Sequence, residues 1–591
     1  GPAAVLKTIT NYKQKDISSH ALMAFGVGNG GGGPGEPHME NLQRLSRTSA
    51  LPGIKQEWTA AFLKKWSKDS KKFQTYTGEL YLEKHQGTFT TQSSVKYYNK
   101  KAEAVLRETE YNLAITQEDS FKAEILSIWQ DVLLYQFHDI LPGSSIKRVY
   151  SECFGAYKKL LKRLNEINAS LYKKVIKKIS CGWQQQGYTA FNSLNWQRSA
   201  WFKIRQQWYQ SELPAMGFTR LEKRNKLNNS FELKANCNQL ENNRIRIKFA
   251  RDGSLFSVFD KYSKREVLPP RQNANVYRIY RDYGDAWDFD YDYFNKKNEI
   301  FILQQSQAWC DGPEAVVKQF YKYKNSSLVL EIKLLADSSR IDFNCRLNWQ
   351  EKFTMLRTCF PVNVNTDTAV CGIQFGAVKR PTTSNDLTEL ARDEVPFHKW
   401  TDIADTGYGA ALLSENKYGI RVKNNILDLN LLRSVPYPYA KTKAEFMQAD
   451  VKDDEACSDI GSHFFRYAFY PHQGNYCQGE VVKEAYNFNF PPVYSKGCPV
   501  EKNRTDFSFM EILQGDIIIE HVKPAENGEG IILRLYEPYN KETEVSVRLN
   551  MPVGRVMLTD LMEKNIKNIP FKNNCFTVRF KPFAVKSLRL I

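Results

Sequence analysis

The stretch "RIRIKFARDGSLFSVFDK", residues 244–261, indicates how most of this chain folds. Apolar and polar residues alternate on both sides of Asp252-Gly253, as in strands with one buried face. An Asp-Gly pair between two alternating arms is a strong signal for a tight turn. The stretch therefore predicts an antiparallel β-hairpin.

The same period of two recurs along the chain after about residue 186. "SLVLEIKLLADSSRIDFNCRLNW" (327–349) and "TEVSVRLNM" (543–551) alternate in the same way. We therefore predict antiparallel β-structure from there onward, with enough strands for two or three sandwich-like units.

A helical pattern precedes the strands. Between residues 37 and 180 apolar residues recur every three or four positions, and Pro142-Gly143 interrupts the pattern. Ser144 or Ser145 can cap the helix that follows. We predict three or four helices packed as a bundle. One of these helices is expected to bury Ile125, Ile128, Trp129, Val132 and Leu133.

The composition is that of a packed protein with several domains. A chain of 591 residues, 42% of them hydrophobic, is too long for one core and predicts two to four domains. The net charge of +18 would suit an anionic partner, but the densest basic stretch, 157–178, has the spacing of a solvated helix face. We expect no nucleic acid and no membrane as partner, because the chain has no nucleic-acid-binding motif and no apolar run near ~20 residues.

The cysteines indicate the compartment. All 11 stand singly without a C-x-x-C pair, which predicts free thiols in a reducing setting. We therefore expect a cytoplasmic protein, or a vacuolar or lysosome-like one that arrives by non-classical delivery.

Two short motifs are candidates for chemistry. His138-Asp139 lies where a helical pattern gives way to a Pro-Gly turn; imidazole suits zinc and carboxylates suit sugar hydroxyls. One histidine does not make a zinc site, and the chain has no H-x-D and no H-x-x-x-H, so the pair is either structural or part of a larger site. "GVGNGGGGPGEP" (26–37) lacks the features of a phosphate-binding loop and is either a linker or tight packing at a binding site.

Several strings in a fixed order resemble the α-mannosidases of glycoside hydrolase family 38, in the branch of the cytosolic and vacuolar enzymes. The strings cover nearly the whole chain, and QFHDILPGSS is highly specific. They are "FGVGNGGGGP" (25–34), "GELYLEKHQGTFTTQSSVKYYNKKAE" (78–103), "QFHDILPGSSIKRVY" (136–150), "AFNSLNWQRS" (190–199), "YGDAWDFD" (283–290), "PFHKWTDIADTGYGAALLSENKYG" (396–419) and "RYAFYPHQG" (466–474).

The resemblance implies an α+β architecture: the end of an α/β barrel, a helical bundle and then large antiparallel β-sandwich domains. We expect the C-terminal end of the catalytic barrel with its glycine loop in residues 1–35. The helical bundle would occupy 36–183, large β-sandwich structure 184–500, and a C-terminal β-sandwich 501–591.

The resemblance also implies retaining hydrolysis of α-mannosides around a bound zinc, with one carboxylate as nucleophile and a second carboxylic acid as proton donor. His138 would be a zinc ligand, and Asp139 would accept hydrogen bonds from mannose hydroxyls. The expected partners are mannose-containing oligosaccharides, together with a second copy of the chain or a complementing barrel chain.

Two departures from the family pattern lead us to expect an inactive chain. In the family, the H-x-D zinc pair and the aspartate nucleophile precede the glycine loop. An α/β barrel takes about 200–250 residues, whereas about 30 residues precede the loop in this sequence. The family's loop is GDGGGGP, and its aspartate, the probable acid/base, is replaced by Asn29. An amide cannot deliver a proton as a carboxylic acid does.

Two hypotheses therefore stay open. The chain is either the C-terminal part of an α-mannosidase or a degenerate relative retained for carbohydrate binding or scaffolding. His138-Asp139 favours the first hypothesis, and Asn29 favours the second.

Overall fold

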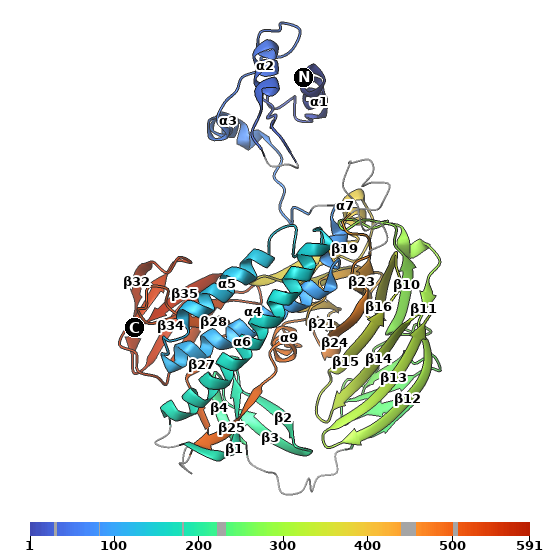
Figure 1. Ribbon diagram of the computed structural model, residues 1–591, viewed down its shortest axis with the longest axis vertical. Helices are drawn as coiled ribbons and strands as arrows, with labels where there is room; N and C mark the ends of the chain where they lie inside the picture. The colour runs from blue at the N-terminus through green and yellow to red at the C-terminus, as the bar shows by residue number, and fades with distance from the viewer. Residues whose placement is uncertain (29–31, 82, 180–182, 222–231, 439–456, 500–505) are drawn as a thin grey trace. The chain divides into compact units, whose positions relative to one another are not determined.

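The computed structural model describes residues 1–28, 32–81, 83–179, 183–221, 232–438, 457–499 and 506–591. It divides into two compact units, Gly1–Tyr81 and Leu82–Ile591. Helices make up most of the regular structure before residue 180, and antiparallel strands dominate after it (Figure 1). The α+β class predicted from the sequence is confirmed.

The first unit consists of short helices and irregular segments. Its described residues contain no β-strand, and only an isolated antiparallel bridge joins Val27 to Gly32 across the glycine loop. The unit continues to Tyr81, so the helix that begins at residue 36 lies within it and not with the helices after residue 90. The boundary expected at 35/36 is therefore not where the compact unit ends. The helices are α1 (Pro2–Asn11), α2 (Glu36–Ser46), α3 (Thr59–Trp66) and the 3-10 helix η1 (Ser67–Lys72).

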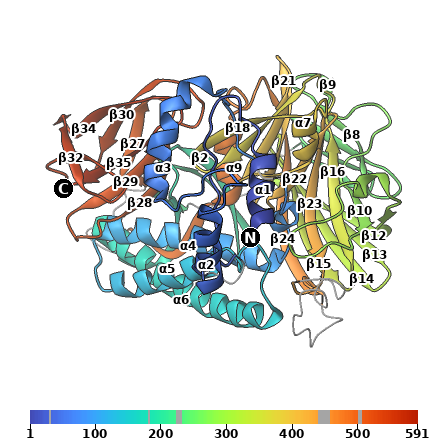
Figure 2. The same cartoon turned by 90° about the horizontal axis from the view of Figure 1, so that it is seen from above.

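Three long helices begin the second unit and lie side by side (Figures 1 and 2). They are α4 (Ser93–Thr116), α5 (Lys122–Tyr135) and α6 (Lys147–Ile179), preceded by the short η2 (Gln86–Phe89). They share an apolar core that includes Leu106, Ile128 and Leu164. None of the helices within the described ranges is long and apolar enough to cross a bilayer.

The predicted buried face of α5 is correct except at one end. Ile125, Ile128 and Val132 are buried, and Trp129 packs partly against the core. Leu133 is 58% exposed, so its assignment to the buried face is wrong. It lies one residue after Val132, and each helical residue turns the side chain by about 100°; that rotation carries Leu133 out of the arc covered by α4 and α6.

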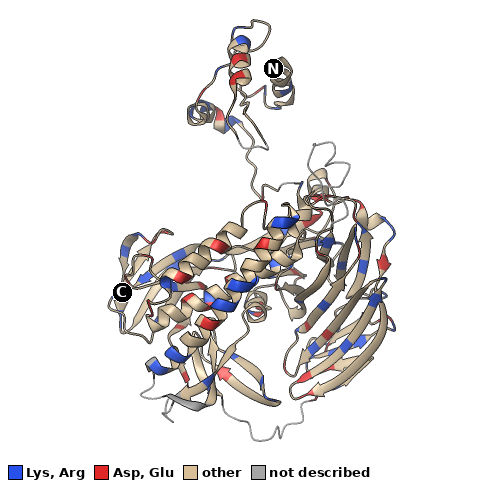
Figure 3. Cartoon of the chain, viewed as in Figure 1, with Lys and Arg blue, Asp and Glu red and all other residues tan. Residues whose placement is uncertain are grey.

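Helix α6 has the amphipathic face that the sequence predicts. Leu160, Leu164 and Leu171 are buried, whereas lysines and arginines occupy the opposite side (Figure 3). The helix begins at Lys147, so neither Ser144 nor Ser145 directly precedes it, and the predicted cap is wrong.

The stretch 244–261 forms the predicted hairpin. Its arms are β7 (Ile245–Phe249) and β8 (Leu255–Asp260), with Ile247 opposite Val258. Gly253 occupies the turn with φ of +84°, a value that glycine adopts without a steric penalty. The sheet is completed by β5 (Lys234–Asn236), β6 (Gln239–Glu241) and β9 (Arg265–Glu266).

A large β-sandwich forms the middle of the second unit. The ring of Phe360 from one sheet lies 5.5 Å from that of Phe343 and 5.0 Å from that of Phe469 in the other sheet. The hydroxyls of Tyr277 and Tyr467 meet across the same interface at 2.6 Å.

The first sheet of this sandwich contains, in spatial order, β11 (Glu299–Ile300), β10 (Val276–Arg281), β16 (Thr354–Pro361), β23 (Ile426–Ser434), β22 (Gly419–Lys423) and β19 (Glu394–Pro396). The second sheet contains β12 (Ile302–Asp311), β13 (Glu314–Tyr323), β14 (Ser326–Leu335), β15 (Ile341–Trp349), β24 (Gly461–Gln473), β21 (Tyr408–Ser414), β20 (Trp400–Ala404), β17 (Thr368–Ile373) and β18 (Gly376–Pro381). The short helices η3 (Tyr293–Asn295), α7 (Leu387–Ala391) and α9 (Val481–Asn489) lie in the connections.

A smaller sheet joins distant parts of the chain. Strand β26 (Asp506–Ser508) pairs with β4 (Gly217–Leu221), so the residues after 500 first continue an earlier sheet. The sheet also contains β1 (Trp183–Asn192) and β25 (Val493–Pro499), and β2 (Arg198–Ile204) forms a hairpin with β3 (Gln207–Leu213).

The C-terminal sandwich starts with β27, later than the predicted boundary at 501. One sheet contains β27 (Met510–Gln514), β30 (Thr543–Leu549), β34 (Cys575–Phe580) and β33 (Phe571–Lys572). The other contains β28 (Ile518–Pro524), β29 (Ile531–Tyr536), β35 (Val585–Leu590), β31 (Val556–Thr559) and β32 (Asn565–Ile569).

Helix α4 contacts the C-terminal sandwich and so connects it to helices α5 and α6. The guanidinium of Arg107, which is 6% exposed, donates to the carbonyl of Glu520 in β28 at 2.9 Å and to the hydroxyl of Ser193 at 2.9 Å. It also lies 4.7 Å from the centroid of the Phe490 ring. The helices and the C-terminal sandwich are therefore parts of one compact unit.

Candidate functional site

The His138-Asp139 pair lies directly after helix α5, in a tight turn. The amides of Ile140 and Leu141 donate to the carbonyl of Phe137 at 2.9 and 3.2 Å, which folds the backbone back on itself. Gln136, just before the turn, donates its side-chain amide to Glu103 of α4 at 3.0 Å. The pair is therefore presented by a backbone anchored to the neighbouring helix.

A buried lysine holds the far side of this turn. Lys96 of α4 donates to the carbonyls of Leu141 at 2.9 Å and Pro142 at 3.3 Å, and also to the carbonyl of Thr91. Its side chain is only 5% exposed, and burial lowers the pKa of Lys96 to about 7, although the nearby Asp459 acts in the opposite direction. Three backbone acceptors match the three N–H donors of an ammonium group.

Two further contacts fix the turn. Gly143 has φ of +104°, and a Cβ built there would lie 2.7 Å from the carbonyl oxygen of Thr91, so a larger residue would displace the turn. The buried hydroxyl of Tyr150 accepts from the amide of Ser145 at 2.9 Å and faces the carbonyl of Asp139 at 3.2 Å. Burial raises the pKa of Tyr150, so the hydroxyl keeps its proton and can donate it.

The side chains of His138 and Asp139 are themselves open to solvent. They are 77% and 50% exposed, and the His138 Nε2 lies 3.5 Å from the Asp139 Oδ2. The imidazole packs on the ring of Phe137, with centroids 4.2 Å apart. The hydroxyl of Ser144 is 3.4 Å from the Asp139 Oδ1. These contacts are at the long limit of hydrogen bonding, so the carboxylate keeps most of its acceptor capacity for a ligand.

The described residues do not fit a zinc ion by themselves. No group of three or more histidine, cysteine, aspartate or glutamate side chains comes together within the ranges that the structure describes. A zinc site takes at least three protein ligands. His138 and Asp139 could contribute to such a site only alongside groups from outside the described residues.

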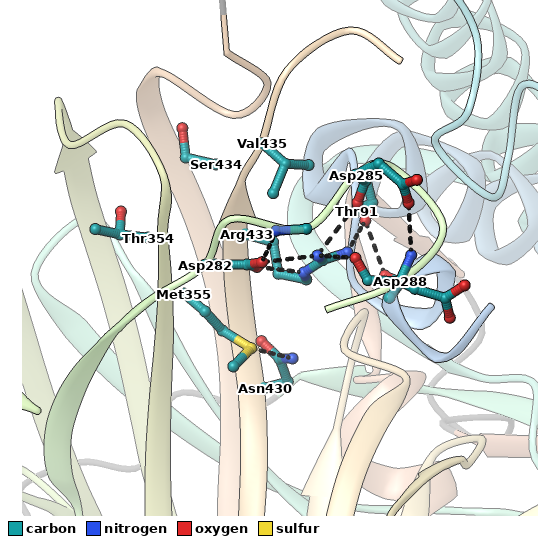
Figure 4. A network of polar contacts seen from close by, with 12 residues as sticks. Thr91, Asp282, Asp285, Asp288, Thr354, Met355, Asn430, Arg433, Ser434 and Val435 are labelled. Atoms are coloured by element: carbon teal, nitrogen blue, oxygen red, sulfur yellow. Dashed lines mark hydrogen bonds and ion pairs between the residues drawn. The ribbon is translucent and has the colours of Figure 1, made fainter. Parts of the chain in front are cut away.

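Behind the turn lies a buried ionic cluster centred on Arg433 of β23 (Figure 4). Arg433 and Asp282 are both 0% exposed and form a two-point pair, Nε–Oδ2 at 2.7 Å and Nη2–Oδ1 at 3.1 Å. The same guanidinium donates to the carbonyls of Asp285 at 3.2 Å and Asp288 at 3.0 Å, and to the hydroxyl of Thr91 at 2.8 Å. These acceptors satisfy a charge that would otherwise be costly to bury.

The Arg433 cluster is connected to the turn through the start of α4. Thr91 accepts from Arg433 with its hydroxyl and from Lys96 with its carbonyl. Asp459 accepts from the first amide of α4, that of Ser93, at 2.8 Å, which satisfies an amide that has no partner within the helix. A continuous set of contacts therefore leads from the sandwich to His138-Asp139.

Four family models match this chain in order. The Glycosyl hydrolases family 38 N-terminal domain matches residues 1–79, and the Alpha mannosidase middle domain matches 83–175. The family 38 C-terminal domain matches 240–441, and the family 38 C-terminal beta sandwich domain matches 516–588.

The chain belongs to glycosyl hydrolase family 38. The alpha-mannosidase 2C1 of Homo sapiens is 30% identical to it, over 99% of this chain and 57% of that protein. The alpha-mannosidase G of Dictyostelium discoideum is 29% identical, over 99% of this chain and 59% of that protein. The chain thus spans less than two thirds of the length of these curated relatives.

A solved structure supports the family 38 fold. An alpha-mannosidase from Enterococcus faecalis V583 superposes with a TM-score of 0.77 at 14% identity, over 99% of this chain and 78% of that chain. At this identity the likeness concerns the fold alone.

Two of the three predicted site residues of this family 38 chain lie in the part that the structure describes. His138 and Asp139 are adjacent and exposed on a supported turn, whereas Asn29 lies outside the described residues. The sequence analysis did not identify Lys96, Asp282 or Arg433 as supporting residues. A signal was present for two of them, because Lys96 lies within the string 78–103 and Asp282 directly precedes the string 283–290.

Proposed function

We propose that this chain is the C-terminal portion of a retaining, zinc-dependent α-mannosidase that hydrolyses terminal α-D-mannosides of oligosaccharides. The observation that supports this most is the pair of exposed side chains, His138 and Asp139, on a turn whose backbone is fixed by buried contacts. A binding group needs both free lone pairs and a rigid support. The family and its named α-mannosidase relatives agree with this role.

In this proposal the two side chains bind and do not carry out the bond cleavage. The Asp139 carboxylate accepts hydrogen bonds from mannose hydroxyls, and the neutral imidazole of His138 supplies one ligand of the metal. Since the described residues do not complete a zinc site, the isolated chain should retain substoichiometric zinc after dialysis. Metal analysis tests this: stoichiometric zinc that disappears in His138→Ala would mean that further ligands lie in residues 1–591.

The same proposal predicts that the 591-residue chain alone does not hydrolyse an aryl α-mannoside. Activity should require a separately expressed family 38 N-terminal domain, and Asp139→Ala should then abolish hydrolysis of the aryl α-mannoside. Arg148→Leu, at an exposed ion pair of α6, is the matched control and should not change the rate. Turnover by the chain alone would refute the incomplete-site proposal.

A second candidate function is that of a carbohydrate-binding or scaffolding relative without activity. The residue that favours it is Asn29, because an amide at the acid/base position removes proton donation, which is typically worth ~10²–10⁴-fold. Asn29→Asp in the reconstituted pair separates the two proposals. It should rescue a natural disaccharide more than an aryl mannoside, whose leaving group needs little protonation. Equal rescue of both substrates, or none, would show that Asn29 is not at the acid/base position.

The proposed location is the cytoplasm. Ten cysteines of the described residues are free thiols, and six of them are buried, as in proteins of a reducing compartment.

A further inference from the structure

The second unit contains a hollow of about 360 Å³ beside helix α4. Its walls come from α4, from α6, from the end of α9 with the start of β25 and the connection between them, and from Glu415 and Arg466 of the large sandwich. The volume lies in the range of small-molecule sites. Neither His138 nor Asp139 lines it.

One wall carries a buried acceptor without a partner. Asn489, at the end of α9, is 5% exposed, and its Nδ2 donates to the carbonyls of Ala485 at 2.9 Å and Ser414 at 3.2 Å. Because both of those partners are acceptors, the amide cannot be flipped. Its Oδ1 has no hydrogen-bond partner among the residues that the structure describes. A buried carbonyl of this kind needs a donor from elsewhere.

The same hollow carries a donor without a partner. Lys100 of α4 is partly buried, and its ammonium lies 5.5 Å from the centroid of the Phe490 ring, next to Asn489. Within the described ranges it makes no ion pair and no hydrogen bond. Burial lowers the pKa of Lys100 to about 8.

The other charges of the hollow are already paired. Lys101 binds the Glu415 carboxylate at 2.6 Å, and Arg466 binds the same carboxylate through two nitrogens at 3.0 and 3.2 Å. Among the charged side chains and the buried polar atoms of the wall, the groups left for a ligand are the donor Lys100 and the acceptor Asn489 Oδ1.

These two groups select the chemistry of the ligand. An anion would satisfy Lys100 but would place its charge against the Asn489 Oδ1 and near Glu108, and a cation would be repelled by Lys100. A hydroxyl both accepts and donates, so neighbouring hydroxyls of one molecule satisfy both groups. The rings of Phe490 and Tyr494, the latter 42% exposed, provide apolar surface for the C–H face of a sugar ring.

We propose that this hollow is a binding site for a neutral sugar, held by Lys100 and Asn489 against the rings of Phe490 and Tyr494. The proposal does not depend on the role of His138 and Asp139, and it adds a carbohydrate site that works without hydrolysis.

The test is titration calorimetry of the 591-residue chain with methyl α-D-mannopyranoside and with mannobiose, and separately with inorganic phosphate. We expect millimolar binding of the sugars and none of phosphate. Lys100→Met keeps the apolar stem and removes the donor, and should weaken sugar binding about tenfold. Lys158→Met, at an exposed lysine of α6, is the matched control and should bind like the unchanged chain.

Hydrogen exchange is a further readout that locates the bound sugar. Hydrogen exchange should slow in α4 and in residues 489–495 when sugar is added, and this should also occur in Asp139→Ala. No sugar binding, unchanged binding in Lys100→Met, or stronger binding of phosphate than of sugar would each overturn the proposal. Loss of binding in Asp139→Ala alone would also overturn it, because it would locate the sugar at the turn.

Discussion

The Arg433 cluster and the His138-Asp139 pair each bring a basic side chain next to an aspartate, but they differ in burial and in the number of partners. Arg433 and Asp282 are 0% exposed, and the guanidinium reaches Thr91 and two carbonyls besides its carboxylate. His138 and Asp139 are 77% and 50% exposed, and their mutual contact is 3.5 Å long. The first group contributes to the fold, and the second is open to solvent.

The difference shows what this chain supplies to a site. The support is complete within the described residues: the sandwich holds Thr91, Thr91 holds Lys96, and Lys96 holds the turn. The candidate side chains on that turn, His138 and Asp139, have few contacts of their own. Mutations in the support should therefore affect stability, and mutations in the exposed pair should affect binding alone.

The largest expected effect on the unfolding free energy is that of a mutation at Arg433. Arg433→Leu leaves the buried carboxylate of Asp282 without its partner, which should cost about 3–5 kcal/mol of unfolding free energy. Urea denaturation followed by tryptophan fluorescence measures it. Arg148→Leu, which breaks an exposed pair with Glu152, should leave the midpoint unchanged. Equal shifts in both variants would remove the distinction between buried and exposed pairs.

A smaller loss of unfolding free energy is expected from a mutation in the turn itself. In Gly143→Ala the new Cβ would meet the Thr91 carbonyl at 2.7 Å, and an alanine at φ of +104° is strained, together costing about 1–3 kcal/mol. Gly155→Ala should have the opposite effect, because Gly155 lies inside α6, two turns from its start, and no atom outside the helix's own backbone lies within 4 Å of the added Cβ. That change should stabilise the chain by about 0.5–1 kcal/mol. Thermal melting of both variants gives the comparison, which fails if the two shifts have the same sign.

The next effect is a pH dependence of the unfolding free energy, which we expect from Lys96. Its pKa is about 7 in the folded chain and about 10.4 when unfolded, so between these values the unfolded chain binds a proton that the native state does not. Stability should therefore rise with pH in this window, by at most about 1.4 kcal/mol per unit, and level off below pH 7.

Lys96→Met isolates this contribution. Asp459, Lys417 and Arg433 surround Lys96, and Lys417 titrates in the same window because burial lowers its pKa to about 8. The measured quantity is therefore the difference in slope between the unchanged chain and the variant, from urea midpoints across the window. Parallel slopes would show that Lys96 stays charged in the folded state throughout.

The smallest expected effect is at the exposed pair. His138→Ala should leave the melting temperature unchanged, because the imidazole is 77% exposed and, within the described residues, contacts the Phe137 ring and the Asp139 carboxylate at the surface. Calorimetry of the purified chain without added metal measures this. A clear drop in the melting temperature would assign the histidine to the support and not to a binding site.

The features predicted correctly from the sequence depend on neighbouring residues. The hairpin at 244–261 follows from local alternation and one Asp-Gly turn, and the amphipathic α6 follows from its own spacing. The prediction for Leu133 was wrong because spacing defines a helix face but not the width of the surface that covers it. The prediction for Ser144 and Ser145 was wrong because Tyr150 binds the amide of Ser145 and the helix starts later.

The supporting residues could not be predicted in the same way. Arg433 and Asp282 are 151 positions apart, and no periodic pattern connects an arginine in one strand with an aspartate after another. The candidate pair His138-Asp139 was identified by its motif, and its exposure was not predictable, because exposure depends on what packs against the turn.

The bond from Arg107 to Glu520 has a consequence for synthesis of the chain. The two residues are 413 positions apart, so at about 5–20 residues per second the ribosome completes helix α4 about 20–80 s before its partner strand emerges. During that interval a guanidinium and an apolar surface that end up buried stay exposed to water. Recovery of soluble protein should therefore depend on chaperones that cover α4 during translation more than on the stability of the finished fold.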